Sequence, residues 1–162
     1  MFWASEVVMG LALAGIGMAV MHDGNHGAFS DKKGINRLIG GVLELTGGNS
    51  EMWQVQHNVL HHSFTNVDGL DEDINPGPLL RFSPLKPHKP WHRFQHFYAW
   101  FFYGLMTLIW VTFKDFVAVN RYRKLNLLGS TGKSYNNLMF RIILAKVIYY
   151  PIVLGLPLAF SG

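Results

Sequence analysis

The sequence contains no cysteine, which excludes disulfide scaffolds, cysteine-ligated zinc and iron–sulfur clusters. Charge is also scarce: 15% of the 162 residues are Asp, Glu, Lys or Arg, against roughly 25% in average soluble domains. The net charge of +4 is small and interrupted by apolar runs, so the sequence does not indicate a nucleic-acid-binding protein. With 49% hydrophobic residues, the chain does not resemble a disordered tail, a small secreted protein or an ordinary soluble domain.

Three apolar stretches are long enough for membrane helices, since a bilayer core of about 30 Å needs roughly 20 residues. They cover residues 2–21, 94–113 and 138–160. The first stretch contains several Gly and Ala residues, which would let a neighbouring helix approach closely. The sequence therefore predicts an all-α integral membrane protein with two to three membrane-embedded helices. Polar helices at the cytoplasmic membrane face are expected within residues 22–91.

The middle apolar stretch has two interpretations. Basic residues crowd the segments before and after it, and the positive-inside rule places each segment in the cytoplasm. These residues are Lys32, Lys33, Arg37, Lys86, Lys89 and Arg93 before it, and Lys114, Arg121, Arg123, Lys124, Lys133 and Arg141 after it. A helix that crossed the membrane once would leave the two segments on opposite sides. The many aromatic rings and His96 favour an interfacial helix, and a crossing helix is the alternative.

Eight histidines are a high count, and five of them fall in two clusters. The clusters consist of His22 and His26, and of His57, His61 and His62. In an α-helix, residues four apart lie about 40° from each other around the axis, so each such pair can reach one cation. His61 and His62 would be about 100° apart, so they could bind two different ions. This geometry predicts a dinuclear metal site, although imidazole ligands alone do not name the metal.

Two other interpretations of the histidines are weaker. A zinc protease would need H-E-x-x-H, but Asp23 and Asn58 stand where the glutamate would be. His88, His92 and His96 are also four apart, but they lie in or beside a loop predicted from five prolines between residues 75 and 90. For these three we expect an interfacial role, or contact with a ligating residue, rather than metal ligation.

Four sequence phrases resemble a known family. They are H-D-G-N-H-G-A-F at 22–29, W-Q-V-Q-H-N-V-L-H-H-S-F-T-N at 53–66, D-G-L-D-E-D-I at 68–74 and F-Q-H-F-Y at 94–98. The first two resemble the first two histidine boxes of membrane fatty acid desaturases. The whole set is most similar to the branch of front-end acyl-lipid and linoleoyl-CoA desaturases. The family's third box, Q-x-x-H-H or H-x-x-H-H, does not occur here, so we expect residues 1–162 to form part of a desaturase domain.

The resemblance implies a non-haem di-iron site at the cytoplasmic face, with no catalytic residue beyond the metal ligands. Its ligands would be His22, His26, His57, His61 and His62. The substrate would be an acyl-CoA or an acyl-lipid that enters from the membrane. No H-P-G-G motif of a fused haem domain occurs in residues 1–162. The electron donor would therefore be a separate protein of the ferredoxin or small haem cytochrome type, or lie outside these residues.

Ligating imidazoles normally donate their other N–H to a carboxylate or carbonyl. The residues expected to accept such bonds are Asp23, Asn25, Asn58 and Asp68. The acidic run of Asp71, Glu72 and Asp73 is expected to form a solvated loop. Two alternatives to a desaturase are a related histidine-box hydroxylase and a catalytically incomplete membrane fragment.

Overall fold

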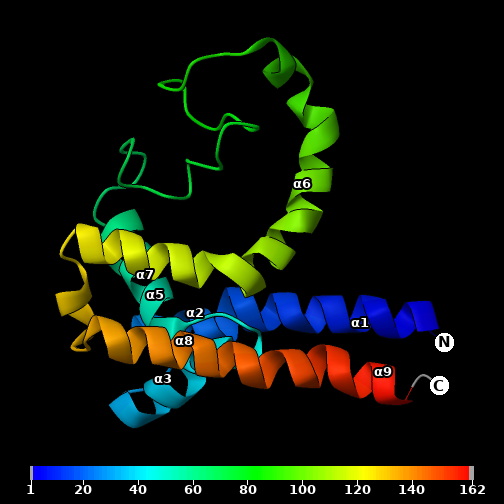
Figure 1. The fold of residues 1–162 in the computed structure, drawn as a ribbon, viewed down its shortest axis with the longest axis vertical. Coiled ribbons are helices and arrows are strands. Elements are labelled where there is room, and N and C mark those ends of the chain that lie inside the picture. The colour runs from blue at the N-terminus through cyan, green and yellow to red at the C-terminus, as the bar shows by residue number, and fades with distance from the viewer. Residues whose placement is uncertain (1, 161–162) are drawn as a thin grey trace. The chain divides into compact units, whose positions relative to one another are not determined.

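The computed structural model describes residues 2–160, and every regular element in that range is a helix (Figure 1). This confirms the all-α expectation. Three of these helices are long and apolar enough to cross a membrane: Trp3–His26, Pro90–Lys124 and Tyr135–Ala159. The chain divides into two compact units, Met1–Glu51 with Ser134–Gly162 and Met52–Lys133, each of which is described by itself.

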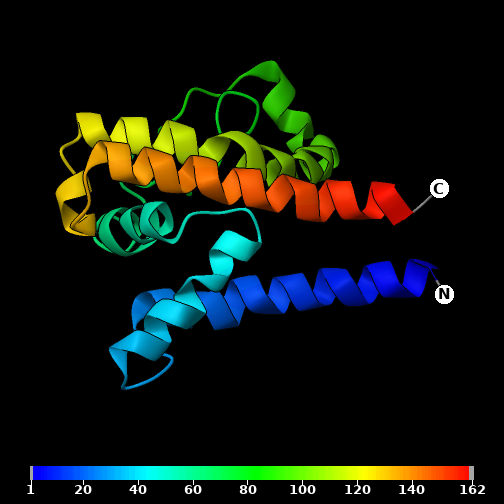
Figure 2. The same cartoon turned by 60° about the horizontal axis from the view of Figure 1, so that its bottom comes forward.

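The first unit contains two long helical runs. The first run consists of α1 (Phe2–Gly15), η1 (Ile16–Val20) and α2 (Met21–His26), and the second of α8 (Tyr135–Tyr150), η6 (Pro151–Gly155) and α9 (Leu156–Phe160). Between them come α3 (Lys33–Gly40), α4 (Val42–Leu45) and the start of α5 (Ser50–Gln54). The two runs are antiparallel, so the end of α2 and the start of α8 lie at the same end of this unit (Figures 1 and 2).

Two glycines make the close contact between α2 and α3. A Cβ atom on Gly24 would lie 2.5 Å from the backbone nitrogen of Gly40, and a Cβ atom on Gly40 would lie 2.7 Å from Oδ1 of Asn25. Asn25 is buried, and its Nδ2 donates to the carbonyls of Met21 and Gly40 at 3.0 Å each. The low helix propensity of Gly24 is therefore offset by packing that a larger residue would prevent.

Polar contacts hold the segment before the second histidine cluster against α8. Lys146, which is buried on α8, donates to the carbonyl of Gly47, and Arg141 pairs with Glu51 at 2.9 Å. Gly47 has a φ of 82°, and a Cβ atom there would lie 3.1 Å from the Tyr149 ring. Only glycine suits this position, because it combines a left-handed backbone with close approach of a ring.

The second unit contains a loop followed by one long helical run. Its elements are η2 (Val55–His61), η3 (Pro90–Phe94), α6 (Gln95–Ile109), η4 (Trp110–Lys114), α7 (Asp115–Lys124) and η5 (Leu128–Thr131). The loop predicted from the prolines is confirmed, because residues 75–89 form no helix. The 35 residues of Pro90–Lys124 would extend about 50 Å at ~1.5 Å per residue, which is more than one crossing needs.

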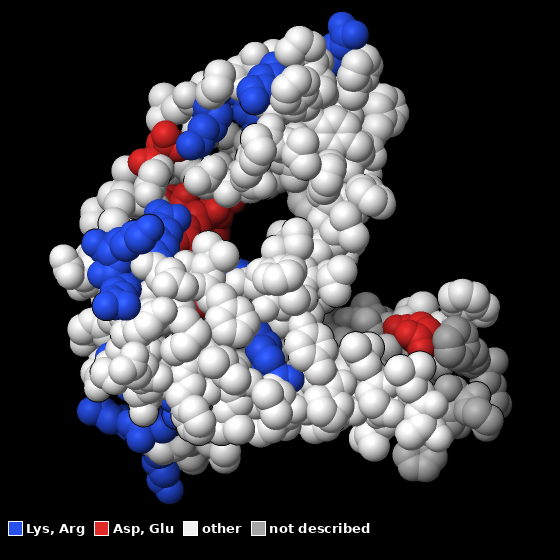
Figure 3. Space-filling model, in the orientation of Figure 1, with Lys and Arg blue, Asp and Glu red and all other residues white. Residues whose placement is uncertain are grey.

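The face of the molecule drawn in Figure 3 is mostly uncharged. Figure 3 shows separate groups of Lys, Arg, Asp and Glu side chains with wide uncharged areas between them. On α6 the exposed side chains include Trp100, Phe101 and Leu108. Apolar exposure on this scale would promote aggregation in water, and it fits helices whose surroundings are lipid.

The contact between α2 and α3 predicts that Gly24→Ala destabilises the protein. The added Cβ atom would overlap the backbone of Gly40, and such overpacking costs typically 1–3 kcal/mol. Gly34→Ala on α3 is the matched control, because nothing lies within 4 Å of its Cβ position. We expect thermal unfolding in detergent to show a lower midpoint for Gly24→Ala alone. Equal midpoints for the two variants would contradict this account of the contact.

Candidate metal centre

The first histidine cluster lies on α2, at the end of the first long helical run. His22 and His26 are one helical turn apart, with ring centroids 4.4 Å apart and an interplanar angle of 67°. Both residues are half-buried. His22 Nδ1 lies 3.0 Å from Asp23 Oδ1, so Asp23 contacts a predicted ligand. Gly27 ends the helix in the left-handed conformation, with a φ of 73°.

Two asparagines stabilise the backbone around this cluster. Asn25, expected from the sequence to support an imidazole, ties α2 to α3 through the bonds given above. The sequence interpretation missed Asn36, whose Nδ2 donates to the carbonyls of Gly27 and Ser30 and whose Oδ1 accepts from the N–H of Ser30. The amide of Asn36 thus holds the turn that follows the cluster. No sequence signal marks this role, because it depends on α3 folding back.

His57 and His61 lie on a π-helix, η2, and His62 follows directly after it, so the expected α-helical geometry is wrong here. A π-helix has i→i+5 hydrogen bonds and commonly occurs at functional sites. The N–H of His62 bonds to the carbonyl of His57 at 3.0 Å. As a result, residues five apart become neighbours, and the Nε2 atoms of His57 and His62 lie 3.2 Å apart.

The structure brings the three rings of this cluster together. The ring centroid of His57 lies 5.3 Å from that of His61 and 4.7 Å from that of His62, and the centroids of His61 and His62 are 5.5 Å apart. Trp53 stacks on His57 at 4.4 Å, with an interplanar angle of 29°. Trp53 therefore covers one face of His57 and restricts its rotation. The sequence interpretation did not single out this tryptophan.

The third ring, His61, contacts two carboxylates. Its Nδ1 lies 3.1 Å from Asp71 Oδ1 and 3.3 Å from Asp73 Oδ2. Asp71 is only 1% exposed, so the expectation of a solvated acidic loop is wrong for this residue. Burial by itself would raise the pKa of Asp71, but hydrogen bonds from the Asn66 backbone, the His61 ring and the Asp73 backbone outweigh it. The pKa of Asp71 therefore lies below its ordinary value.

The other acidic and amide candidates lie elsewhere. Asp68 pairs with Lys86 at 2.9 Å, which places its carboxylate on a partly exposed lysine. Asn58 lies half-buried on η2 between the predicted ligands. The sequence phrase D-G-L-D-E-D-I at 68–74 contains the buried carboxylate, but the pattern of the sequence did not indicate which of its aspartates is buried against His61.

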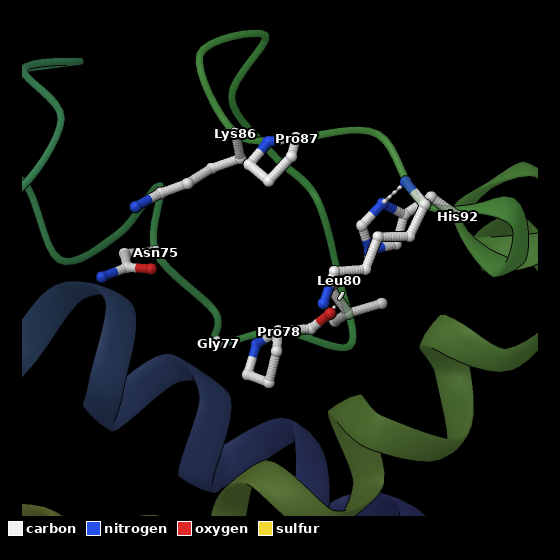
Figure 4. A pocket seen from close by; sticks show the side chains of 8 residues that line it. Asn75, Gly77, Pro78, Leu80, Lys86, Pro87 and His92 are labelled. Atoms are coloured by element: carbon white, nitrogen blue, oxygen red, sulfur yellow. Dashed lines mark hydrogen bonds between the residues drawn. The ribbon is translucent and has the colours of Figure 1, made fainter.

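The remaining histidines belong to the proline-rich loop and the start of α6. His92 is buried; its Nδ1 accepts from the N–H of Lys89 at 3.1 Å, and its Nε2 lies 3.3 Å from the carbonyl of Pro78 (Figure 4). His92 also lines a cavity of about 310 Å³ with Lys86. Both of its ring nitrogens face backbone groups, so His92 stabilises the loop. His88 and His96 are exposed.

A larger cavity of about 500 Å³ is lined in part by Asp73, one of the two carboxylates that contact His61. Its lining combines polar and charged groups with apolar and aromatic ones. The polar and charged residues are Gln56, Glu72, Asp73, Asn75, Lys114 and Arg121, and the apolar and aromatic residues are Pro76, Phe82, Tyr103 and Met106. Arg121 pairs with Glu72 at 2.9 Å and donates to the carbonyl of Gly69. The lining thus combines apolar side chains from α6 and the proline-rich loop with charged side chains from the acidic loop, η4 and α7.

The second cluster fits a transition-metal ion. Two nitrogens bound at about 2.1 Å to one ion, at a right angle, would lie about 3 Å apart. The 3.2 Å between the Nε2 atoms of His57 and His62 is close to this spacing, so they need little rearrangement to bind one ion. Imidazole donors suit iron, zinc, copper and nickel. The two clusters belong to different units, and their union in one dinuclear centre is a prediction from the resemblance.

An all-helical membrane protein with a cluster of imidazoles at metal-binding spacing is the class that these observations define. A family model described as fatty acid desaturase matches residues 1–162. The chain therefore belongs to the fatty acid desaturase family, which confirms the resemblance found from its histidine boxes.

Several curated relatives are similar to the chain. It is 38% identical over 104 residues to the sn-1 linoleoyl-lipid 6-desaturase of Arthrospira platensis, covering 64% of this chain and 28% of that protein. It is 36% identical over 157 residues to the chloroplastic acyl-lipid (7-3)-desaturase of Chlamydomonas reinhardtii, covering 96% and 30%. It is 31% identical over 163 residues to the sn-1 linoleoyl-lipid 6-desaturase of Synechocystis, covering 94% and 42%. The chain thus spans less than half the length of these relatives. No solved structure matches it.

The spacing of the second cluster predicts the effect of removing its rings. His57→Ala and His62→Ala should each lower the affinity for Co²⁺ at least tenfold, because each removes one nitrogen of the close pair. His88→Ala is the matched control, since His88 is exposed and lies in the proline-rich loop. Cobalt absorption during titration of the purified protein measures the affinity. A similar loss in His88→Ala, or none in His57→Ala, would contradict the assignment.

Proposed function

We propose that the protein containing this chain is a membrane di-iron desaturase that introduces a double bond into the acyl chain of a lipid. The observation that carries the proposal is the cluster of three imidazoles on η2 and directly after it, within a chain of the fatty acid desaturase family. The named activities of the acyl-lipid desaturases similar to it support the same substrate class.

Desaturation removes hydrogens from adjacent methylene groups, whose C–H bonds no side chain of ordinary pKa can break. Two iron ions, when bound, would supply this oxidation with O₂ and external electrons. The residues that would hold them are His22, His26, His57, His61 and His62. The electrons would come from a separate donor, a ferredoxin or a small haem cytochrome.

The protein's own side chains would orient the ligands and the substrate. Asp23 contacts His22, and Trp53 stacks on His57, so both limit the rotation of predicted ligands. The cavity beside the acidic loop has the mixed lining that an acyl ester requires. Apolar side chains such as Met106 would contact the acyl chain, and Gln56 would hydrogen-bond the ester group.

The geometry of the first unit supports a membrane topology. Because α2 ends and α8 begins at the same end of this unit (Figures 1 and 2), residues 27–134 would begin and end on one side of the membrane. A single crossing by Pro90–Lys124 would violate this, so we infer that this helix lies at the interface or re-enters. The basic residues near the end of α7 favour the cytoplasm for that side by the positive-inside rule.

Cysteine labelling tests this topology, and the absence of native cysteine from this chain simplifies the experiment. Ser30→Cys and Ser130→Cys would be made in the complete protein, with any other cysteine replaced. We expect neither to react with a membrane-impermeant maleimide in intact cells, and both to react after permeabilisation. Labelling of Ser130→Cys in intact cells would instead show that Pro90–Lys124 crosses the membrane.

Expression of the complete coding sequence tests the activity. Gas chromatography with mass spectrometry of cellular fatty acids should reveal a new double bond, and His61→Ala should abolish it. His88→Ala should retain it. No new double bond in an iron-loaded protein supplied with reductant would contradict the proposal. Hydroxylated fatty acids would identify a hydroxylase instead.

A further inference from the structure

Asp71 is a buried carboxylate of the second unit whose two oxygens both accept hydrogen bonds. Its Oδ2 accepts from the N–H of Asn66 at 2.8 Å, and its Oδ1 accepts from the N–H of Asp73 at 3.0 Å. The same Oδ1 lies 3.1 Å from His61 Nδ1. With 1% exposure, the carboxylate has these protein donors in place of bulk water, which satisfies the requirement for burying a charged group.

A tight turn brings Asp71 back to His61, ten residues earlier. Asn66 adopts the left-handed conformation, with a φ of 64°, which asparagine tolerates better than most residues. The N–H of Asp71 bonds to the carbonyl of Val67 at 2.9 Å, and Thr65 Oγ1 donates to the carbonyl of His61. The backbone therefore fixes the position of the carboxylate independently of the imidazole.

The contact determines which nitrogen of His61 carries the proton. An ionised carboxylate only accepts hydrogen bonds, so Nδ1 of a neutral His61 must donate to it. Nε2 then has the free lone pair that a metal ion requires. Asp73 reinforces this arrangement, because its Oδ2 lies 3.3 Å from the same nitrogen and its Oδ1 accepts from Gln56 at 3.0 Å.

We propose that Asp71 is a positioning residue of the metal centre, which holds His61 in the Nδ1–H form and so presents Nε2 to a divalent cation. The proposal rests on the metal site of the proposed function. It replaces Asp68, which the sequence indicated for such a role and which pairs with Lys86.

A competing arrangement would place the cation between His61 Nδ1 and the two carboxylates. The ligand atoms of His61, Asp71 and Asp73 lie within 4.8 Å of one another. However, both oxygens of Asp71 already accept from backbone N–H groups, and these bonds would compete with a cation. The proposal therefore favours Asp71 as the partner of the imidazole.

Nitrogen NMR of ¹⁵N-histidine-labelled protein in detergent tests the proposal without any turnover. The His61 signals would be assigned by comparison with His61→Gln. In the metal-free wild type at neutral pH, we expect His61 to carry its proton on Nδ1 and to keep it when Zn²⁺ binds. A proton on Nε2, or loss of the Nδ1 proton on addition of Zn²⁺, would overturn the proposal.

Two variants provide the second measurement. Asp71→Asn has a single acceptor oxygen for three donors, and we expect it to weaken Zn²⁺ binding about 10–100-fold. Asp68→Asn, in the same loop, should bind Zn²⁺ within about twofold of wild type. Equal affinities in the two variants would overturn the proposal. If Asp71→Asn does not fold, the wild-type tautomer decides alone.

These measurements separate the proposal from the proposed function. Normal desaturation with an Nε2-protonated His61 would contradict only the role of Asp71. An Nδ1-protonated His61 that binds Zn²⁺, in a protein that makes no unsaturated product, would contradict only the desaturase activity.

Discussion

The i→i+5 hydrogen bonding of residues 55–61 is the constraint on which the second histidine cluster depends. It brings together His57 and His62, five residues apart, and their Nε2 atoms approach to 3.2 Å. Such a turn is unfavourable in isolation and persists where the surroundings stabilise it. Here Val55 and Leu60 are buried on the same turn, and Trp53 stacks on His57. The geometry of the imidazoles is thus a consequence of packing around an unusual helical turn.

Each cluster is supported by a contact that tolerates little change. At the first cluster, Gly24 and Gly40 allow α2 and α3 to touch, and Asn25 joins them. At the second cluster, the buried Asp71 is held by two backbone N–H groups and meets His61. In both cases a polar side chain, Asn25 or Asp71, forms hydrogen bonds with backbone atoms and lies close in the chain or in space to a predicted ligand. The rigidity of such supports favours binding by reducing the rearrangement that a ligand must induce.

Much of the fold follows from local rules. The apolar stretches predict helices because a lipid environment requires internal backbone hydrogen bonding, and prolines predict the loop because they lack a donor. The helix Pro90–Lys124 exceeds its predicted end because α7 is charged, and hydropathy does not detect polar helices. The burial of Asp71 and the bonds of His92 could not be predicted, since each depends on a turn that returns the chain over ten or more residues.

The sequence by itself determined the helical class, the family and the five histidines that are candidates for metal ligation. Continuous apolar segments long enough to cross a membrane predict helices, and the spacing of the histidine boxes is specific to the family. Only the tertiary structure decided that the second cluster is π-helical and that Asp71, rather than Asp68, meets His61. Those outcomes depend on which backbone N–H groups remain free to donate to a carboxylate after folding. Contacts between segments far apart in the chain decide this.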